Sequence, residues 1–476
     1  MFTAITRRKS LLLGAASFLL GACSVGPDYI KPTVETPAAY KEGDGWKTAQ
    51  PGDTRLTAKW WELFGDSDLN RLEEQVAISN QNVALAAARY RQARAIVEGA
   101  KSAYYPSLTA GASATRSSGS TNAGRSQGGE QSDFLLPVNL SWEIDVWGRI
   151  ARSVEASKAG LQASNADLAA AQLSAQAELA SDYMQLSALD AQKRCLDETI
   201  VYYRKAVELT RNRYAAGVAA KVDLLQADTQ LKSTQAQMID LGALRAQLEH
   251  AIAVLIGKPT AVFSLPPLPL TALPPSIPPA LPSELLERRP DVASAERSMA
   301  SANAQIGVAR AAFYPTVKLG TSVGLEASDI AKWLSWPSRF WSVGPTVSQT
   351  LFDGGLRHSQ SDQALAQYDA SVASYRQIVL DAFRDVEDNL AVLRILAEEA
   401  RVQDEAVDAA RQTVEITLNQ YRSGVVGYLN VVSAQTAELA NKRTAIGILG
   451  RRMTAAVLLM KALGGGWDQA GMGKLP

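Results

Sequence analysis

The chain has 476 residues, with 48 basic and 48 acidic side chains, so its net charge is close to zero at neutral pH. This balance gives no electrostatic basis for binding nucleic acid or another polyanion. Cys23 and Cys195 are the only cysteines, too few for a disulfide framework.

The N-terminus has the order of a bacterial export signal. Basic residues 7–9 precede an apolar stretch, residues 11–22, which is shorter than the roughly 20 residues that a transmembrane helix needs. The stretch ends in Leu20-Gly21-Ala22-Cys23, which resembles a lipobox, and Ser24 follows. We therefore expect a covalent lipid on Cys23 and sorting to the outer membrane of a Gram-negative bacterium. The alternative is an ordinary secretory signal with a chance cysteine.

The two halves of the chain repeat the same order of segments. Tyr105-Pro106 recurs as Tyr314-Pro315, and the turn at residues 214–218 recurs at residues 421–425. The offset is 209 positions for the prolines (106 to 315) and 207 for the turn glycines (217 to 424). Because an internal repeat sets the architecture, we expect two copies of one unit in a single elongated object.

Each half contains two segments in which apolar and polar residues alternate: 106–116 and 134–147, then 315–326 and 341–352. Such alternation predicts strands with one face in an apolar phase and the other in water. Each segment has about the length of a tilted membrane strand. No later stretch is apolar for long enough to be a transmembrane helix, so these strands would have to cross any membrane. The alternative is a pair of water-soluble hairpins packed on a helical body.

Long helices are predicted beside these strands. No Gly or Pro lies between Gly160 and Gly217 or between Gly355 and Gly424, so helices there would reach roughly 85 and 100 Å. In the second run, apolar residues recur every 3.5 positions on average, which predicts a left-handed coiled-coil seam. The seam residues are Leu365, Tyr368, Val372, Tyr375, Val379, Phe383, Val386, Leu390 and Leu393. Since roughly eight strands are the fewest that close a barrel, a chain with four must oligomerise to span a bilayer.

A series of short motifs runs through the mature chain in order. They are Cys23 with Val25-Gly26-Pro27-Asp28-Tyr29, Trp60-Trp61-Glu62-Leu63-Phe64, Trp147-Gly148-Arg149, Arg288-Arg289-Pro290-Asp291, Ala311-Ala312-Phe313-Tyr314-Pro315, Phe352-Asp353-Gly354-Gly355 and Ala462-Leu463-Gly464-Gly465-Gly466-Trp467. Together they resemble the lipoprotein branch of the TolC-like outer-membrane factors.

The resemblance implies a homotrimer in which four strands from each chain form a twelve-stranded outer-membrane β-barrel on a periplasmic α-barrel. It also implies a passive exit duct, joined by a periplasmic adaptor to an inner-membrane resistance-nodulation-division pump and surrounded by outer-membrane lipid. The predicted fold class is therefore mainly α with a transmembrane β portion. The expected divisions are a signal peptide (1–22), a lipidated linker (23–58), repeat 1 (59–258), a Pro-rich linker (259–282), repeat 2 (283–466) and a tail (467–476).

The turns that end the two long helices, residues 214–222 and 421–429, are the expected docking sites for the adaptor. By resemblance they are formed by Tyr214, Gly217 and Val218 in the first repeat and by Tyr421, Gly424 and Val425 in the second. Each glycine also fits a simple structural role, as a left-handed residue that ends a helix.

A periplasmic gate is expected just beyond these turns. Many relatives carry aspartates six and nine positions after the second turn glycine, where this chain has Asn430 and Ser433; the first repeat has Asp223 and Gln226. Two unit charges about 7 Å apart repel by roughly 0.6 kcal/mol in water. With neutral residues there, we expect closure by packing and hydrogen bonds, and weak block by divalent cations.

The sequence gives no basis for catalysis. His250 and His358 are the only histidines, and we find no phosphate loop, nucleophile elbow or HExxH pair. We expect no enzymatic activity, no bound metal and no cofactor apart from the lipid on Cys23. The function predicted is efflux of drugs or other small toxic compounds. The alternatives are a duct for type I protein or peptide secretion and a non-conducting, lipid-anchored coiled-coil scaffold of the envelope.

Overall fold

The computed structural model describes residues 25–43, 59–120, 130–270, 273–275, 277 and 288–467. The signal segment, Cys23 and the tail beyond residue 467 lie outside these residues. The chain forms two compact units, each assembled from separate stretches. The first unit takes in residues 1–33, 90–164 and 295–375, and the second takes in residues 34–89, 165–294 and 376–476.

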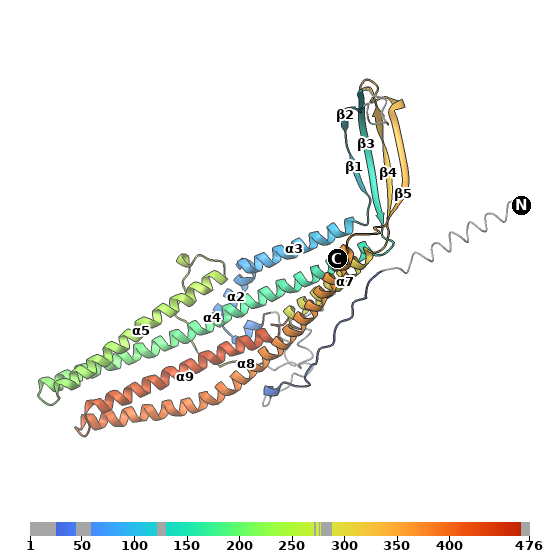
Figure 1. Cartoon of the computed structure of the whole chain (residues 1–476). Helices are drawn as coiled ribbons and strands as arrows, with labels where there is room; N and C mark the ends of the chain where they lie inside the picture. Colours follow the sequence, from blue (N-terminus) through green and yellow to red (C-terminus); the bar gives the residue numbers. More distant parts are fainter. Residues whose placement is uncertain are drawn as a thin grey trace. The chain divides into compact units, whose positions relative to one another are not determined.

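The first unit contains an antiparallel sheet, seen side by side as β1 to β5 in Figure 1. β1 (Ser107–Ala110) and β2 (Ser113–Ser118) pair with one side of β3 (Glu130–Ile144), and β4 (Thr316–Ala327) pairs with its other side. β5 (Arg339–Ser348) pairs with β4. Since β3 belongs to the first repeat and β4 to the second, the two repeats join in one sheet.

The strand predicted at about residues 106–116 is divided in the structure into β1 and β2. Ala110 lies opposite Val138 and Ser113 opposite Leu135, so β1 and β2 keep one register. Only residues 111–112 lie outside the strands, and the N–H of Gly111 still donates to the carbonyl of Pro137 at 3.0 Å. The gap lies beside Pro137, which has no N–H to donate. The other strands differ only at their ends: β3 begins at residue 130 rather than 134, and β5 ends at residue 348 rather than 352.

Helices make up most of the described chain, which confirms the predicted fold class. α3 (Gln81–Ser102) precedes β1 and α7 (Pro290–Ala311) precedes β4, while α4 (Arg149–Ala215) follows β3 and α8 (Leu356–Arg422) follows β5. α4 and α8 have 67 residues each, and α5 (Lys221–Leu255) and α9 (Tyr428–Ala462) have 35 each. The equal lengths show the same unit built twice. α2 (Ser67–Ser79) and the short 3₁₀ turns η1 to η4 complete the described elements.

An aspartate begins each of the two longest helices. Asp145 accepts hydrogen bonds from the N–H groups of Ile150 (3.0 Å) and Ala151 (2.7 Å). Asp353 accepts from the N–H of Arg357 at 3.3 Å and is 208 positions further on (145 to 353). These carboxylates satisfy N–H groups that have no partner within the helix. The motifs at residues 147–149 and 352–355 therefore form the junctions between strand and helix.

The predicted seam of α8 is only partly buried. From Tyr375 onward its residues pack into the interior, with Val379, Val386 and Leu390 fully buried, whereas Leu365 is exposed. The seam therefore forms in the middle of α8, at residues 375–393, almost all of which belong to the second unit. None of the described helices is both long enough and apolar enough to cross a bilayer.

Candidate functional site: the two faces of the sheet and the ends of the helical hairpins

The sheet has one apolar face and one polar face, and the register of its strands shows it directly. Across β3 and β4, Val138 lies opposite Val323 and Trp142 opposite Leu319, while Glu143 lies opposite Lys318. Neighbouring residues along a strand point to opposite faces. Most apolar residues are therefore matched with apolar residues and most polar ones with polar ones, as the alternation predicted, although Leu135 lies opposite Glu326 and Leu140 opposite Thr321.

The apolar face is uncovered in the described part of the chain. Val343 is 60% exposed and Trp341 75% exposed, and Leu108, Val323 and Val347 on the same face are also exposed. A water-soluble hairpin packed on a helical body would bury these side chains. A contiguous apolar surface of this kind marks contact with lipid or with another protein.

Aromatic residues lie at both ends of this face. At the end that carries the 328–338 loop, the guanidinium of Arg339 lies 4.0 Å from the ring centroid of Trp336. At the helical end, the Trp147 ring stacks on Tyr314 with centroids 4.9 Å apart, and Trp147 donates to the carbonyl of Pro315. Aromatic rings at the two limits of an apolar band are typical of strands that cross a membrane.

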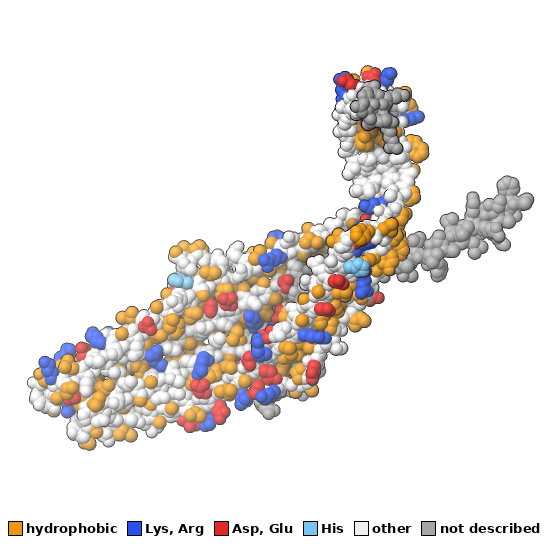
Figure 2. All heavy atoms as spheres, viewed as in Figure 1, with side chains coloured by type: hydrophobic (Ala, Val, Ile, Leu, Met, Phe, Trp, Pro, Cys, Tyr) orange, Lys and Arg blue, Asp and Glu red, His pale blue; other side chains and the backbone are white. Residues whose placement is uncertain are grey.

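Charged residues on the polar face gather near the helices. Glu143 accepts from the guanidinium of Arg149 at 2.8 Å and lies opposite Lys318 in the ladder. Charged side chains of both signs also gather at the far end of the sheet (Figure 2), where Arg116 pairs with Glu130 on the other face, beyond its last apolar residue, Phe134. The polar face is thus suited to water.

The hairpin turns place most of the predicted docking residues on the surface. Gly217 and Gly424 have φ values of 73° and 77°, which favour glycine. Tyr214, Val218 and Val425 are exposed beside them. Tyr421 differs: it is only 3% exposed, so it supports the turn from inside.

Tyr421 belongs to a cluster that joins the two hairpins. Its ring meets that of Tyr428 edge-on at 5.2 Å, and Ile200, Val207, Leu231 and Val431 pack in the same cluster. Burial raises the pKa of Tyr428 to about 12. The cluster draws residues from α4, α5, α8 and α9, so the ends of the two hairpins share one core.

The predicted gate residues occupy two different settings. Asp223 accepts from the N–H of Ala220 at 3.3 Å and so helps to begin α5, while the side-chain oxygen of Gln226 is buried with no partner among the described residues. Asn430 and Ser433 are exposed on α9. Within the described residues, no hydrogen bond joins the first pair to the second. The gate therefore stays a prediction.

Hydrogen bonds between the hairpins form a set of contacts that the sequence analysis missed. We call them the inter-hairpin contacts: Arg213 to the carbonyl of Arg422 (3.4 Å), Gln230 to Thr436 (3.1 Å) and Arg443 to Gln237 (2.9 Å). The Arg213 guanidinium also lies 4.8 Å from the centroid of the Tyr421 ring. The partners are separated by 209, 206 and 206 positions, nearly the repeat period. Pairing of equivalent positions was the signal that could have revealed them.

The segment after the predicted lipidation site docks on the first unit. The Val25 N–H donates to the carbonyl of Trp147 at 3.1 Å, and Asp28 pairs with the buried Arg152 at 2.9 Å. The hydroxyl of Tyr29 donates to Glu296 at 2.6 Å. The motif at residues 25–29 therefore fixes the chain at the junction of β3 and α4.

Comparison with known proteins agrees with this architecture. The family model described as outer membrane efflux protein matches residues 72–258 and 281–465. The probable efflux pump outer membrane protein TtgC of Pseudomonas putida is 29% identical over 469 residues, 97% of each chain. The cation efflux system protein CusC of Escherichia coli is 26% identical over 96% of this chain and 99% of its own. The solved structure of the outer-membrane channel OprN is 31% identical, with a TM-score of 0.88 over 94% of this chain and 100% of that one.

A two-faced sheet joined to paired long hairpins defines the TolC-like class of outer-membrane channels. The chain belongs to the outer membrane efflux protein family. Members of this family are channels rather than enzymes.

Proposed function

We propose that the chain is the outer-membrane exit duct of a tripartite efflux pump, conducting drugs or other small toxic compounds passively from the periplasm to the exterior. The observation that carries the proposal is the sheet, which has an exposed apolar face on one side and a mainly polar face on the other. Together these faces fit lipid on the outside and water on the inside. The efflux components among the relatives support the same role.

The height of the apolar face fits a bilayer. Val317 and Leu325 are eight positions apart on β4, a rise of about 26 Å along the strand, or about 20 Å along the membrane normal at a tilt of about 40°. Barrels carry an outward apolar band of about 25 Å flanked by aromatic residues. Arg339, opposite Leu325 and stacked on Trp336, fits the outer boundary of that band.

The sheet needs further copies to close. In the described chain, β1 and β2 form one edge and β5 the other, and each pairs on one side only. Open edges are not tolerated within lipid. With β1 and β2 sharing one strand position, a homotrimer supplies twelve positions, enough for a barrel whose polar face encloses a water-filled pore.

Lipidation at Cys23 would anchor each chain beside this barrel. Val25 lies two residues further on and is bonded to Trp147 at the helical end of the sheet. An acyl chain on Cys23 would then enter the leaflet at the level where the strands begin. The docked segment supports this position because Arg152 and Asn303 hold it from α4 and α7.

The hairpin turns would receive the periplasmic adaptor, which links the duct to an inner-membrane resistance-nodulation-division pump. Val218 and Val425 are exposed apolar residues on rigid, glycine-shaped turns, which suits a protein contact. The gate would lie close by, with the neutral Asn430 and Ser433 in place of acidic rings. Opening would separate the hairpins and break the inter-hairpin contacts. The paired hairpins would then act as a packed element with two states, closed and open.

Cross-linking in living cells tests the assignment of partners. Val218→Cys in a Cys195→Ser background, treated with a thiol-reactive cross-linker, should capture an adaptor together with a proton-driven pump. Lys221→Cys serves as a second test position further along the same turn. Ile239→Cys, on the exposed side of α5, serves as a distant control. Capture of an ATP-driven exporter would favour a secretion duct, and capture only at the control position would contradict docking at the turns.

A further inference from the structure

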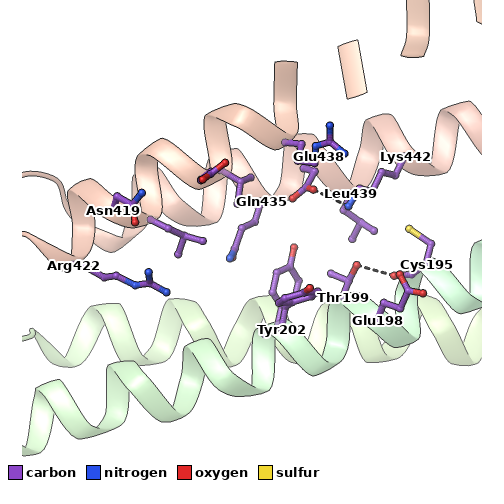
Figure 3. A pocket seen from close by; sticks show the side chains of 15 residues that line it. Cys195, Glu198, Thr199, Tyr202, Asn419, Arg422, Gln435, Glu438, Leu439 and Lys442 are labelled. Carbon is purple, nitrogen blue, oxygen red and sulfur yellow. Dashed lines mark hydrogen bonds and ion pairs between the residues drawn. The ribbon is translucent and has the colours of Figure 1, made fainter. Parts of the chain in front are cut away.

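A polar pocket of about 540 Å³ lies within the second unit, between α4 of one hairpin and α8 and α9 of the other. Figure 3 shows Arg422 and Asn419 at one end and Glu198, Cys195 and Lys442 at the other, with Gln435 and Tyr202 between them. A volume of this size is typical of small-molecule sites. Of these residues, only Arg422 falls within a predicted docking turn (421–429), and none belongs to the predicted gate.

One residue that lines the pocket, Gln435, carries an unpaired polar atom. Its side chain is only 8% exposed, and its amide oxygen is buried with no hydrogen-bond partner in the described chain. Buried polar atoms nearly always have a partner, because leaving one unpaired costs free energy. Gln435 lines the pocket, so a small rotation of its side chain would let this oxygen accept a hydrogen bond from an occupant.

The unpaired charges that line the pocket are separated by sign. Lys442 is paired with Glu438 at 2.7 Å, and Arg411 with Asp408 at 3.0 Å, so these cations are already neutralised. Within the described residues, the carboxylate of Glu198 and the guanidinium of Arg422 have no ion-pair partner. Glu415, also without one, lies two helical turns before Arg422 on α8. The pocket therefore offers a cation at one end and carboxylates toward the other.

The length of the pocket sets the size of a matching ligand. Its lining on α8 runs from Arg411 to Arg422, a rise of about 16 Å, and on α4 from Cys195 to Tyr203, about 12 Å. Long side chains at both ends shorten the free span to the order of 10 Å. Tyr202 and Tyr203 on α4 and Leu439 on α9 supply apolar and aromatic surface between the ends.

We propose that this pocket binds a zwitterionic small molecule whose ammonium and carboxylate groups lie about 10 Å apart, as in a short peptide. The carboxylate meets Arg422, the ammonium meets Glu198, and a donor in the body of the molecule reaches the oxygen of Gln435. Because Glu198 belongs to α4 and Arg422 to α8, the occupant bridges the two hairpins. The binding step is independent of the proposed duct; only an effect of the ligand on conductance would rest on it.

Calorimetric titration of the purified full-length protein with the tripeptide Gly-Tyr-Gly and its blocked forms tests the proposal. Three residues span about 10 Å when extended. The N-acetyl form lacks the ammonium, the C-terminal amide lacks the carboxylate, and the doubly blocked form lacks both. The zwitterion should bind at least tenfold more tightly than either singly blocked form, and the doubly blocked form weakest of all.

Variants then assign each end. Glu198→Gln should weaken binding of the zwitterion and of the amide about tenfold and leave the N-acetyl form unchanged. Arg422→Gln should show the opposite pattern, and Gln435→Leu should weaken all forms. Glu405→Gln, an exposed carboxylate on α8 outside the pocket, is the matched control.

Cys195 gives a readout that needs no variant. Its thiol lines the pocket, so bound zwitterion should slow its modification by a thiol reagent at least threefold, while the doubly blocked peptide should not. Equal affinity for all four peptides, or equal binding by the variants and the wild type, would overturn the proposal. If peptide binding fails in this way but the protein conducts ions, the pocket proposal is wrong and the proposed duct is unaffected. If the protein binds the peptide as expected but does not conduct, the proposed duct is wrong and the pocket proposal is unaffected.

Discussion

Val343→Lys is the most direct perturbation of the apolar face. Val343 is 60% exposed on β5 and lies opposite Thr321, four positions from Val347 and four from Arg339. At roughly 3.3 Å per residue this places it about 13 Å along the strand from each end of the band, near the midplane of a bilayer. A lysine on the lipid face costs about 2–4 kcal/mol at the midplane.

That cost corresponds to about a 30- to 900-fold loss in the equilibrium for membrane folding. Ser342→Lys is the matched control, because Ser342 is the neighbouring residue and points to the opposite, polar face. The assay is folding from urea into lipid vesicles, followed by protection of the sheet from protease. Val343→Lys should shift the midpoint to lower urea, and Ser342→Lys should leave it close to wild type. Equal shifts for the two variants would refute the assignment of the faces.

Three further predictions follow from individual contacts. Arg213→Gln removes the cation–π contact with Tyr421 and one inter-hairpin hydrogen bond, together worth about 1–2 kcal/mol. In single-channel recordings the ratio of open to closed time should therefore rise about 5- to 30-fold. An equal rise with Arg211→Gln would contradict this prediction. Burial raises the pKa of Glu73 to about 9 from 4.5, so the folded protein holds an extra proton between these values and loses stability as pH rises through this window. In urea melts, Glu73→Gln should therefore raise the free energy of unfolding by up to about 3 kcal/mol at pH 7 and leave it unchanged near pH 4. An increase that does not depend on pH would refute this. Gly307→Ala places a methyl group 2.8 Å from Cγ of Arg152 and 3.0 Å from the carbonyl of Val25; it should lower the melting temperature and expose the N-terminal segment to protease, whereas Gly99→Ala, with open space around it, should raise stability by about 0.5–1 kcal/mol.

The alternation of residue types predicted the faces of the sheet because side chains alternate along any strand, whatever lies around it. It did not predict the gap at residues 111–112, since that gap depends on Pro137 of the neighbouring strand. Pairing between strands is a long-range property, and a single segment does not reveal it.

The hairpins show the same limit. Absence of Gly and Pro predicted the long helices, and the turn glycines marked their ends. The repeat placed Tyr214 and Tyr421 in matching positions, yet Tyr214 is exposed and Tyr421 is buried against Tyr428. Equivalent residues in a repeat differ when one copy packs on the other. The inter-hairpin contacts and the pocket near Gln435 likewise depend on how two helices from different repeats face each other.

Conductance across a planar lipid bilayer is the measurement that tests the duct most directly. Purified, lipidated protein added to one side should produce stepwise ion currents, and magnesium should reduce them only weakly, because Asn430 and Ser433 are neutral. Asp223→Asn should then change the magnesium response little. Protein that inserts with its sheet protected from protease but carries no current would contradict the account.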